Sequence, residues 1–209
     1  MEQYGEYKVT ERIFGEGAKT VFKAVPASGG RLSPLIVKAL RPPAGDPDAG
    51  EAFLNAARMQ AEIAEGAPDA WLKIHGTGQA ENEVYYAADY VSESLASLAA
   101  AHFRPQGEVL SSCLLNVIAG LKIVRAEKGR PHGNLKLSNI RIEGSGPIGN
   151  RRFLLTDPAP FVDAGQGDPD LPALGSSLLV LAGGRRSEDF VPDSVPDEDW
   201  SPQFGNRQG

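Results

Sequence analysis

The segment RPHGNLKLSNIRI, residues 130–142, is a polar loop that runs into a short apolar alternation. His132 and Asn134 lie near its start, and Lys136 and Asn139 follow before the strand-like end. The segment contains no Asp or Glu. It therefore has no carboxylate for accepting a proton.

Upstream of this loop, residues 1–91 predict a sheet with one helix. Segments rich in β-forming residues are expected to be five strands, at residues 6–14, 20–25, 34–40, 70–78 and 83–91. Residues 50–64 predict a helix, because apolar residues recur at helical spacing and Gly66 and Pro68 follow. The face expected to pack inward consists of Phe53, Ala56, Ala57, Gln60, Ile63 and Ala64.

Downstream, residues 92–186 predict a mainly helical region. A short helical pattern covers residues 93–102, and a long one covers residues 107–129 and ends at Gly129. Two short strands, NIRI and RRFLLTD, come next, and LPALGSSLLVLAGG predicts an apolar helix or a buried segment. Residues 187–209 are acidic and proline-rich, which predicts a disordered or loosely attached tail.

The overall charge excludes some classes of partner. The 209 residues include 27 Asp and Glu against 21 Lys and Arg, and the formal net charge is −6. This acidic balance argues against a nucleic-acid-binding protein. No apolar run reaches the ~18 residues that span a bilayer, and MEQYGEYKVT lacks the features of a signal peptide. We therefore expect a cytoplasmic protein with no membrane insertion in this chain.

The cysteine and histidine content excludes two kinds of site. Cys113 is the only cysteine, so a disulfide framework and a cysteine-rich metal site are both excluded. It falls in the long helical pattern and is expected to be a buried hydrophobic residue rather than a reactive thiol. His75, His102 and His132 do not lie at ligand spacing, so a metal-hydrolase site has no support.

Six segments, taken in order, resemble the motifs of the protein-kinase-like superfamily, of the bacterial Ser/Thr kinase type. FGEGAKTVFKAV resembles the glycine-rich loop, LIVKAL the strand with the phosphate-binding lysine, and AADYVSESL the hinge. HGNLKLSNI resembles the catalytic loop, LLTDPAP the metal-binding motif, and DLPALGSSLLVLAGGR the central helix of the larger lobe. Each segment alone is a weak signal, whereas six in order form a strong one.

The resemblance implies an α+β fold of two lobes. Residues 1–91 would form a five-stranded antiparallel N-lobe with one helix, residues 92–186 a truncated, mainly helical C-lobe, and residues 187–209 the tail. It also implies a gatekeeper at Ala88 and a central helix that begins at Asp170. In kinases such a helix follows the activation segment, and here its first carboxylate could accept N–H bonds from the catalytic loop.

The resemblance also implies site residues. Lys136 would lie near the transferred phosphate, and Asn139 and Asp157 would be the Mg²⁺ ligands. ATP or ADP with Mg²⁺ is the cofactor that the resemblance raises, although the interpretation we favour is that these residues persist for the fold alone. The candidate nucleotide-binding residues are Gly15, Gly17, Val21, Lys38, Asp89, Val91, Asn139 and Asp157.

Two departures from the kinase pattern remove carboxylates. Asn134 stands where a kinase has its catalytic Asp, and an amide cannot take up a proton near neutral pH. Ala56 stands where the first helix places a Glu to pair with the strand lysine. Glu62, the nearest acidic alternative, lies nearly two turns further along. We therefore expect Lys38 to pair with Asp157 instead.

Two more departures affect the nucleotide pocket. The glycine loop from Gly15 to Val21 is one residue short and lacks its third glycine, so Lys19 or Thr20 fills its tip. Arg141 stands where kinases place an apolar residue under the adenine ring. Its guanidinium would either block the pocket or turn to solvent. Alternatively, the strand register is shifted by one residue, which would reverse the face of this side chain.

The largest departure is the segment between Asp157 and Asp170, which lie thirteen residues apart. Kinases place a long activation segment there, so this chain has no room for a peptide-docking platform. Pro158 and Ala159 replace the Phe and Gly of the metal-binding motif. The later helices of the larger lobe are missing as well, unless the chain is a fragment of a longer protein.

Together these departures predict a pseudokinase domain that acts as a protein-interaction or regulatory module, with nucleotide binding weak or lost. No functional catalytic residue is expected. A protein partner or a second copy would bind the apolar face of ALGSSLLVLA, which later helices cover in kinases. The alternative is a minimal ATP-binding phosphotransferase or an ATP sensor, supported by the retained Lys38, Lys136, Asn139 and Asp157.

Overall fold

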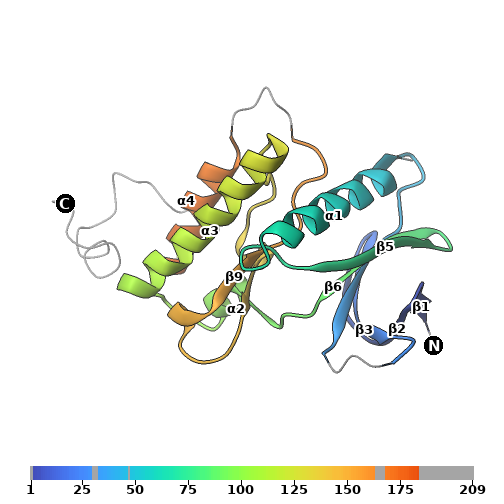
Figure 1. Cartoon of the computed structure of the whole chain (residues 1–209), viewed down its shortest axis with the longest axis horizontal. Coiled ribbons are helices and arrows are strands. Elements are labelled where there is room, and N and C mark those ends of the chain that lie inside the picture. Colours follow the sequence, from blue (N-terminus) through green and yellow to red (C-terminus); the bar gives the residue numbers. More distant parts are fainter. Residues whose placement is uncertain (1, 30–32, 47, 163–167, 184–209) are drawn as a thin grey trace. The chain divides into compact units, whose positions relative to one another are not determined.

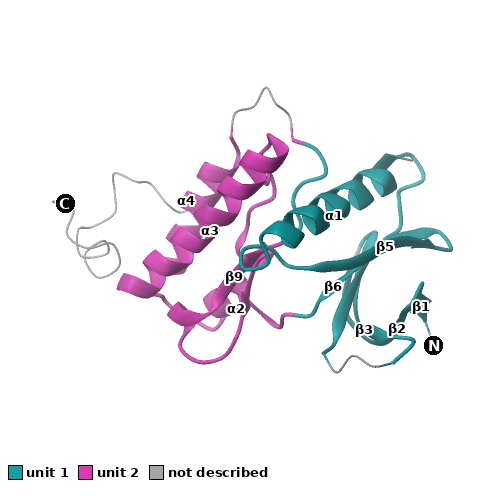
Figure 2. Cartoon of the chain, viewed as in Figure 1, with its two compact units in different colours: residues 1–90, 157–161 teal, residues 91–156, 162–209 magenta. Residues whose placement is uncertain are grey.

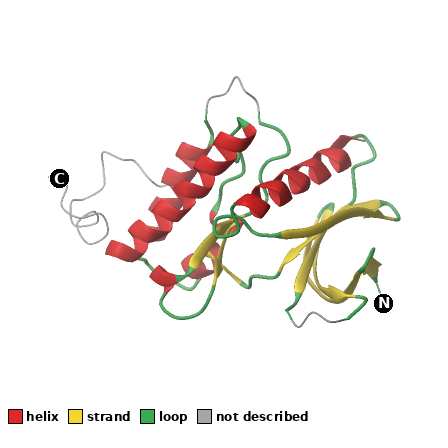
Figure 3. Ribbon diagram, viewed as in Figure 1, coloured by secondary structure: helices red, strands yellow, loops and turns green. Residues whose placement is uncertain are grey.

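The structure is a computed structural model that describes residues 2–29, 33–46, 48–162 and 168–183. Helices and antiparallel strands make up most of the described chain (Figure 3). The chain divides into two compact units (Figure 2). Unit 1 comprises Met1–Tyr90 and Asp157–Phe161, and unit 2 comprises Val91–Thr156 and Val162–Gly209. Residues 157–161 thus belong with the N-terminal half of the chain, although sequence order places them in the second lobe.

Unit 1 contains one sheet, in which the strand order is β1-β2-β3-β4-β6-β5 and all neighbours are antiparallel (Figure 1). The strands are β1 (Gln3–Tyr4), β2 (Tyr7–Glu16), β3 (Lys19–Pro26), β4 (Leu35–Leu40), β5 (Ile74–Ala80) and β6 (Glu83–Asp89). The five longer strands overlap the five predicted segments. The sheet has a sixth strand that the sequence did not predict, because β1 is only two residues long and depends on a left-handed turn at Gly5, where φ is 56°.

Side-chain alternation along these strands gives the sheet a buried aromatic and aliphatic face. Its core cluster contains Tyr4, Tyr7, Phe22, Ala24, Leu35, Val37, Ala39, Tyr85 and Ala87. The helix α1 (Asp48–Gly66) packs against β5 and β6, where Leu54 contacts Leu40 and Val84 in a smaller cluster. The buried residues of α1 include Ala56, Ala57, Gln60, Ile63 and Ala64, so the face predicted from helical spacing is the one that packs inward.

Unit 2 contains a second, three-stranded antiparallel sheet in the order β7-β8-β9. Its elements are β7 (Glu93–Ser94), α2 (Leu95–Ala100), α3 (Gly107–Lys128), η1 (Leu137–Asn139), β8 (Ile140–Glu143), η2 (Ile148–Asn150), β9 (Arg152–Leu155) and α4 (Asp170–Gly183). The predicted helix over residues 93–102 is shorter in the structure. Ser94 caps it through a reciprocal pair of hydrogen bonds with Ser97, and the residues before Leu95 pair as a strand.

The long helix α3 ends where the sequence predicts, at Gly129, which takes the left-handed conformation with φ 64°. It packs against β9 and η2 and buries Leu110, Cys113, Val117, Gly120 and Val124. By length and composition alone, α3 is the one helix in the described part of the chain that could cross a membrane. One such helix is weak evidence for a membrane span, because core helices of folded domains can have the same length and composition.

The last described element, α4, begins at Asp170 as the resemblance implies. It packs against α2 and buries Leu174, Ser177, Leu181 and Ala182. Leu171 is 67% exposed, and Leu178 and Leu179 are only partly buried. The predicted tail, residues 187–209, lies outside the described residues.

Candidate functional site

Lys38 on β4 and Tyr86 on β6 are direct cross-strand neighbours in unit 1. Directly opposite residues in an antiparallel pair present their side chains to the same face of the sheet. Lys38 Nζ lies 5.7 Å from the centre of the Tyr86 ring. The pairing register of β4 with β6 therefore sets an ammonium group and a phenol side by side.

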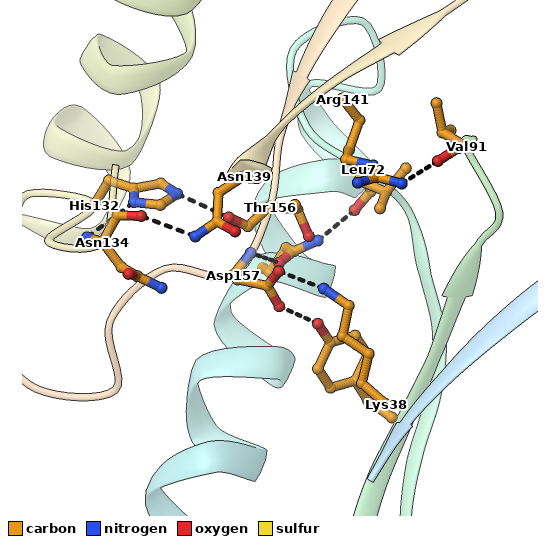
Figure 4. Close-up of polar contacts among 11 residues, drawn as sticks. Lys38, Leu72, Val91, His132, Asn134, Asn139, Arg141, Thr156 and Asp157 are labelled. Atoms are coloured by element: carbon orange, nitrogen blue, oxygen red, sulfur yellow. Dashed lines mark hydrogen bonds and ion pairs between the residues drawn. The ribbon is translucent and has the colours of Figure 1, made fainter. Parts of the chain in front are cut away.

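Asp157 accepts hydrogen bonds from both of these side chains (Figure 4). The Lys38 ammonium donates to Oδ2 in an ion pair, and the Tyr86 hydroxyl donates to Oδ1. The side chains of Lys38 and Asp157 are 22% and 24% exposed, so the pair is partly shielded from water. The predicted pairing of Lys38 with Asp157 is present, and Tyr86 is an additional partner that the sequence did not predict.

The backbone of Asp157 is also fixed within unit 1. Its N–H donates to Oε1 of Gln60 over 2.8 Å, and Nε2 of Gln60 donates to the carbonyl of Leu72 over 2.8 Å. Gln60 is 1% exposed, so its amide bridges two backbone groups in the interior. Asp157 itself has φ 57°, in the left-handed region that non-glycine residues rarely adopt. The Gln60 bridge helps to hold this conformation.

Gln60 is the residue that sequence reasoning missed. It lies one turn after Ala56, so both project from the same face of α1. Ala56 is 9% exposed and offers no polar atom to Lys38. The exposed Glu62 lies on another face of the helix. The sequence did contain one indication of this role. Gln60 is the only amide among apolar residues on a face predicted to be buried, and a buried amide needs hydrogen-bond partners.

The hinge residues of unit 1 use their polar groups within the unit. The N–H of Asp89 donates to the carbonyl of Lys73 over 3.1 Å, and the N–H of Tyr90 donates to the carbonyl of Pro34 over 3.3 Å. Oδ1 of Asp89 lies 2.9 Å from Nε2 of His75. Ala88, the predicted gatekeeper, is fully buried. The N–H groups of Asp89 and Tyr90 are therefore engaged by neighbouring backbone.

The glycine-rich segment is a tight hairpin between β2 and β3. Its ladder continues to the pairs Gly15 with Thr20 and Glu16 with Lys19, so only Gly17 and Ala18 form the turn. Gly17 has φ 56°, as a two-residue hairpin turn requires. The predicted shortening of this loop therefore takes the form of a closed hairpin, with Val21 partly buried at its base.

In unit 2, Asp170 braces the catalytic-loop segment. Its Oδ2 accepts from the N–H of His132 over 2.7 Å, and its Oδ1 accepts from the N–H of Gly133 over 2.8 Å. Asp170 is 4% exposed and His132 is fully buried. A ring nitrogen of His132, Nε2, lies 3.1 Å from the carbonyl oxygen of Thr156. The first residue of α4 thus accepts the loop N–H bonds that the resemblance implies.

The same loop contains the remaining predicted residues of unit 2. Nδ2 of Asn139 donates to the carbonyl of Asn134 over 2.9 Å, and the carbonyl of Asn139 accepts from the N–H of Thr156 over 3.1 Å. Asn139 is 5% exposed, so its amide is a brace inside the loop. Lys136 is exposed. Lys136 and Ser138 are exposed in this loop, and Asn134 is partly buried.

Arg141 on β8 binds the backbone of the hinge residue Val91 in unit 2. Its Nη2 donates to the carbonyl of Val91. Burial alternates along β8, with Ile140 and Ile142 buried and Arg141 between them partly exposed. Arg141 therefore points to the opposite face from its two neighbours, and its guanidinium takes a carbonyl that the resemblance places at the adenine edge.

Comparison with known proteins addresses the fold. No protein-family model and no curated protein sequence matches this chain. The kinase domain of PknI from Mycobacterium tuberculosis, solved as a double mutant, is 19% identical with a TM-score of 0.64, over 94% of this chain and 81% of that one. This chain has a protein-kinase-like fold. A single mutant of the same kinase domain is 18% identical with a TM-score of 0.66, over 87% and 76% of the two chains.

At these identities the likeness shows the kinase-like fold alone. In that fold, the strand lysine binds nucleotide phosphates and the Asp at the position of Asp157 binds Mg²⁺. Here Lys38 and Tyr86 occupy both oxygens of that carboxylate. Mg²⁺ requires oxygen ligands at about 2.0–2.1 Å in near-octahedral geometry, so an ion at Asp157 would have to compete with these two donors for the carboxylate. Within the described ranges, no group of three or more His, Cys, Asp or Glu residues could hold a metal.

Proposed function

We propose that this chain is a pseudokinase domain, a regulatory or protein-binding module with no useful phosphotransfer and with nucleotide binding weak or lost. The observation that carries the proposal is the state of Asp157, whose two oxygens accept from Lys38 and Tyr86. The two groups that would hold phosphate and Mg²⁺ in a kinase are thus bound to each other. A nucleotide would have to break this ion pair before either group could contact it.

Two further features support the proposal. Asn134 cannot serve as a proton acceptor, and a positioned base contributes about 10²- to 10⁴-fold to rate. Arg141 engages the carbonyl of Val91 at the predicted adenine edge. Each feature weakens a different step, because one concerns chemistry and the other nucleotide recognition.

Thermal melts of the full chain with ATP or ADP, with and without Mg²⁺, test the nucleotide part of the proposal. A ligand at ~100 times its Kd adds about 2.7 kcal/mol of stability, which is a readily measured rise in Tm. We expect no rise with either nucleotide. A Mg²⁺-dependent rise that Asp157→Ala abolishes would contradict the proposal and favour an ATP sensor.

One specific observation favours the alternative of a minimal phosphotransferase. Lys136 is exposed, and it lies in the loop whose backbone N–H at Gly133 donates to Asp170. This alternative predicts ADP release in the presence of ATP and Mg²⁺. The control is Lys38→Ala, which removes the phosphate-binding position. Equal ADP release from both proteins would exclude the enzyme, whereas release by the wild type alone would exclude the pseudokinase.

A binding module also needs a surface, and we propose the partly uncovered face of α4 in a cytoplasmic setting. Leu171 is 67% exposed at its start. We expect a protein partner or a second copy there, and no nucleic acid, given the net charge of −6. Light scattering over a concentration series would detect a second copy. Leu171→Asp should abolish that association, whereas Leu115→Asp on α3, at the same 67% exposure, should not.

A further inference from the structure

The side chain of Tyr86 is held in the interior of unit 1 at 3% exposure. Its ring centre lies 5.3 Å from that of Phe53 on α1, with the two planes tilted by 34°. The Lys38 ammonium lies 5.7 Å from the same ring centre, within the range of a cation–π contact. These contacts, together with the register of β4 against β6, fix the direction in which the phenol points.

The Tyr86 hydroxyl donates a hydrogen bond to Oδ1 of Asp157. We propose that Tyr86 excludes divalent cations from Asp157 by occupying this oxygen. The inference rests on the proposed function and assigns the loss of cation binding to one residue. It separates this loss from the missing base at Asn134, which bears on proton transfer only.

The physical basis is competition for one carboxylate. A cation bound to Oδ1 at about 2.0–2.1 Å would draw electron density from the oxygen that accepts the Tyr86 hydroxyl, and would compete with that hydroxyl for space. The hydrogen bond of Tyr86 would be weakened or lost inside a packed interior, where a hydrogen bond to a charged group is among the stronger ones. The ring cannot swing away without disturbing its contact with Phe53. Lys38 on the other oxygen adds a repulsive positive charge.

Tyr86→Phe removes only the hydroxyl and keeps the ring. The electron paramagnetic resonance signal of free Mn²⁺ measures how much of the ion is bound. We expect the wild type to show no saturable Mn²⁺ binding up to millimolar concentration. We expect Tyr86→Phe to gain one saturable site, with Mn²⁺ affinity rising about 10- to 100-fold, the range that one hydrogen bond to a charged group spans. Adding Asp157→Asn to that variant should abolish the gained site.

Tyr85→Phe is the matched control. Tyr85 is the preceding residue on β6, is 6% exposed, and belongs to the core cluster on the other face of the sheet. It should leave Mn²⁺ binding unchanged from the wild type. Equal gains in Tyr85→Phe and Tyr86→Phe would overturn the inference, because the effect would then not depend on the hydroxyl at Asp157.

The outcomes separate this inference from the proposed function. Saturable Mn²⁺ binding by the wild type that Asp157→Asn removes would overturn both. A folded Tyr86→Phe that gains no site, beside a wild type with no response to nucleotide, would overturn the inference and leave the pseudokinase proposal standing. Mn²⁺ binding by Tyr86→Phe that survives Asp157→Asn would also overturn the inference, since the ion would then be bound elsewhere.

Circular dichroism and the Tm show whether Tyr86→Phe is folded. If it is not, nuclear magnetic resonance of the wild type provides a second test that needs no change at Tyr86. Two buried tyrosine hydroxyls donate to carboxylates, that of Tyr4 to Glu83 and that of Tyr86 to Asp157. We expect slow exchange from both, and a change in the Tyr86 signal alone in Asp157→Asn. Exchange at Tyr86 as fast as that of free tyrosine would overturn the inference.

Discussion

Lys38 and Asp157 lie 119 positions apart in the sequence and form an ion pair within one compact unit. Ala56, which stands where a kinase places the glutamate of its first helix, has no carboxylate to offer Lys38. A lysine in a partly buried position needs a counter-charge. Asp157 supplies it, and the residue expected to bind a metal becomes a structural partner of the residue expected to bind phosphate.

The first prediction concerns the strength of this pair. Lys38→Met and Asp157→Asn should each lower the free energy of unfolding by about 1–3 kcal/mol, since each leaves a partly buried charge or polar group with one interaction fewer. The double variant should be less destabilised than the sum of the two, by about 0.5–3 kcal/mol. Urea denaturation of the four proteins of the cycle measures the coupling.

The pair Arg58 with Glu51 is the control for this cycle. It is a hydrogen-bonded ion pair on α1, with side chains that are 48% and 60% exposed. Solvent screening should leave its coupling near zero. Strict additivity for Lys38 and Asp157, as for the control pair, would mean that their contact does not stabilise unit 1.

The second prediction concerns Gln60. Gln60→Leu keeps the side-chain volume but removes the amide that joins the N–H of Asp157 to the carbonyl of Leu72. We expect a loss of about 1–3 kcal/mol in the free energy of unfolding, because the buried carbonyl of Leu72 and the partly buried N–H of Asp157 each lose a hydrogen bond. Gln79→Leu on β5 makes the same chemical change at an exposed position and should stay within about 0.5 kcal/mol of the wild type.

The third prediction concerns Asn134. Asn134→Asp restores a proton acceptor to the loop, yet it leaves Asp157 bound to Lys38 and Tyr86. A general base increases the rate only of a complex whose phosphates and metal are already in place. The control is the double variant that combines Asn134→Asp with Asp157→Ala. We therefore expect the single variant Asn134→Asp to release ADP no faster than this control. Faster ADP release than in this control would show that the missing proton acceptor at residue 134 is alone responsible for the lack of activity.

The fourth prediction concerns alkaline pH. Burial raises the pKa of the Cys113 thiol from 9.0 to about 12. Between these values the unfolded chain releases the thiol proton while the folded chain retains it, so the folded state loses stability as the pH rises above about 9. The decline from this one group approaches about 1.4 kcal/mol per pH unit. Below pH 9 the thiol is protonated in both states and adds no slope.

Cys113→Ala isolates this contribution. The difference between the stability–pH profiles of the wild type and Cys113→Ala should be flat below pH 9 and fall above it. In the native wild type, the thiol should also react with a disulfide reagent at pH 8 far more slowly than in the unfolded chain, because Cys113 is 3% exposed. Equal reaction rates in both states would contradict a buried, protonated thiol.

Most of the secondary structure follows from the sequence pattern. Three local patterns agree with the packing in the structure. They are the alternation of side chains along the long strands, the apolar face of α1 and the glycine that ends α3. The two-residue strands β1 and β7 could not be predicted, because two residues carry no period and form strands only when a partner strand is present. The extent of α2 depends likewise on a capping pair at Ser94.

The candidate site was predictable in part. The pairing of Lys38 with Asp157 was predicted because Ala56 has no carboxylate and a lysine in a partly buried position needs another counter-charge. The role of Tyr86 depends on which residue of β6 lies opposite Lys38, and a register slip by one residue would put Tyr85 there instead. Sequence alone does not fix that register. Gln60 was assigned to the correct face of α1, but its two partners come from segments that only the fold brings together.

The short stretch Asp157–Phe161 belongs to unit 1 although the chain reaches it only after passing through much of unit 2. A fragment cut after Tyr90 would therefore keep every long strand of the first sheet and still lack the carboxylate that Lys38 and Tyr86 contact. The first half of this polypeptide therefore contains two of the three groups that meet in this contact, and the third comes from a stretch that follows Thr156 in the chain.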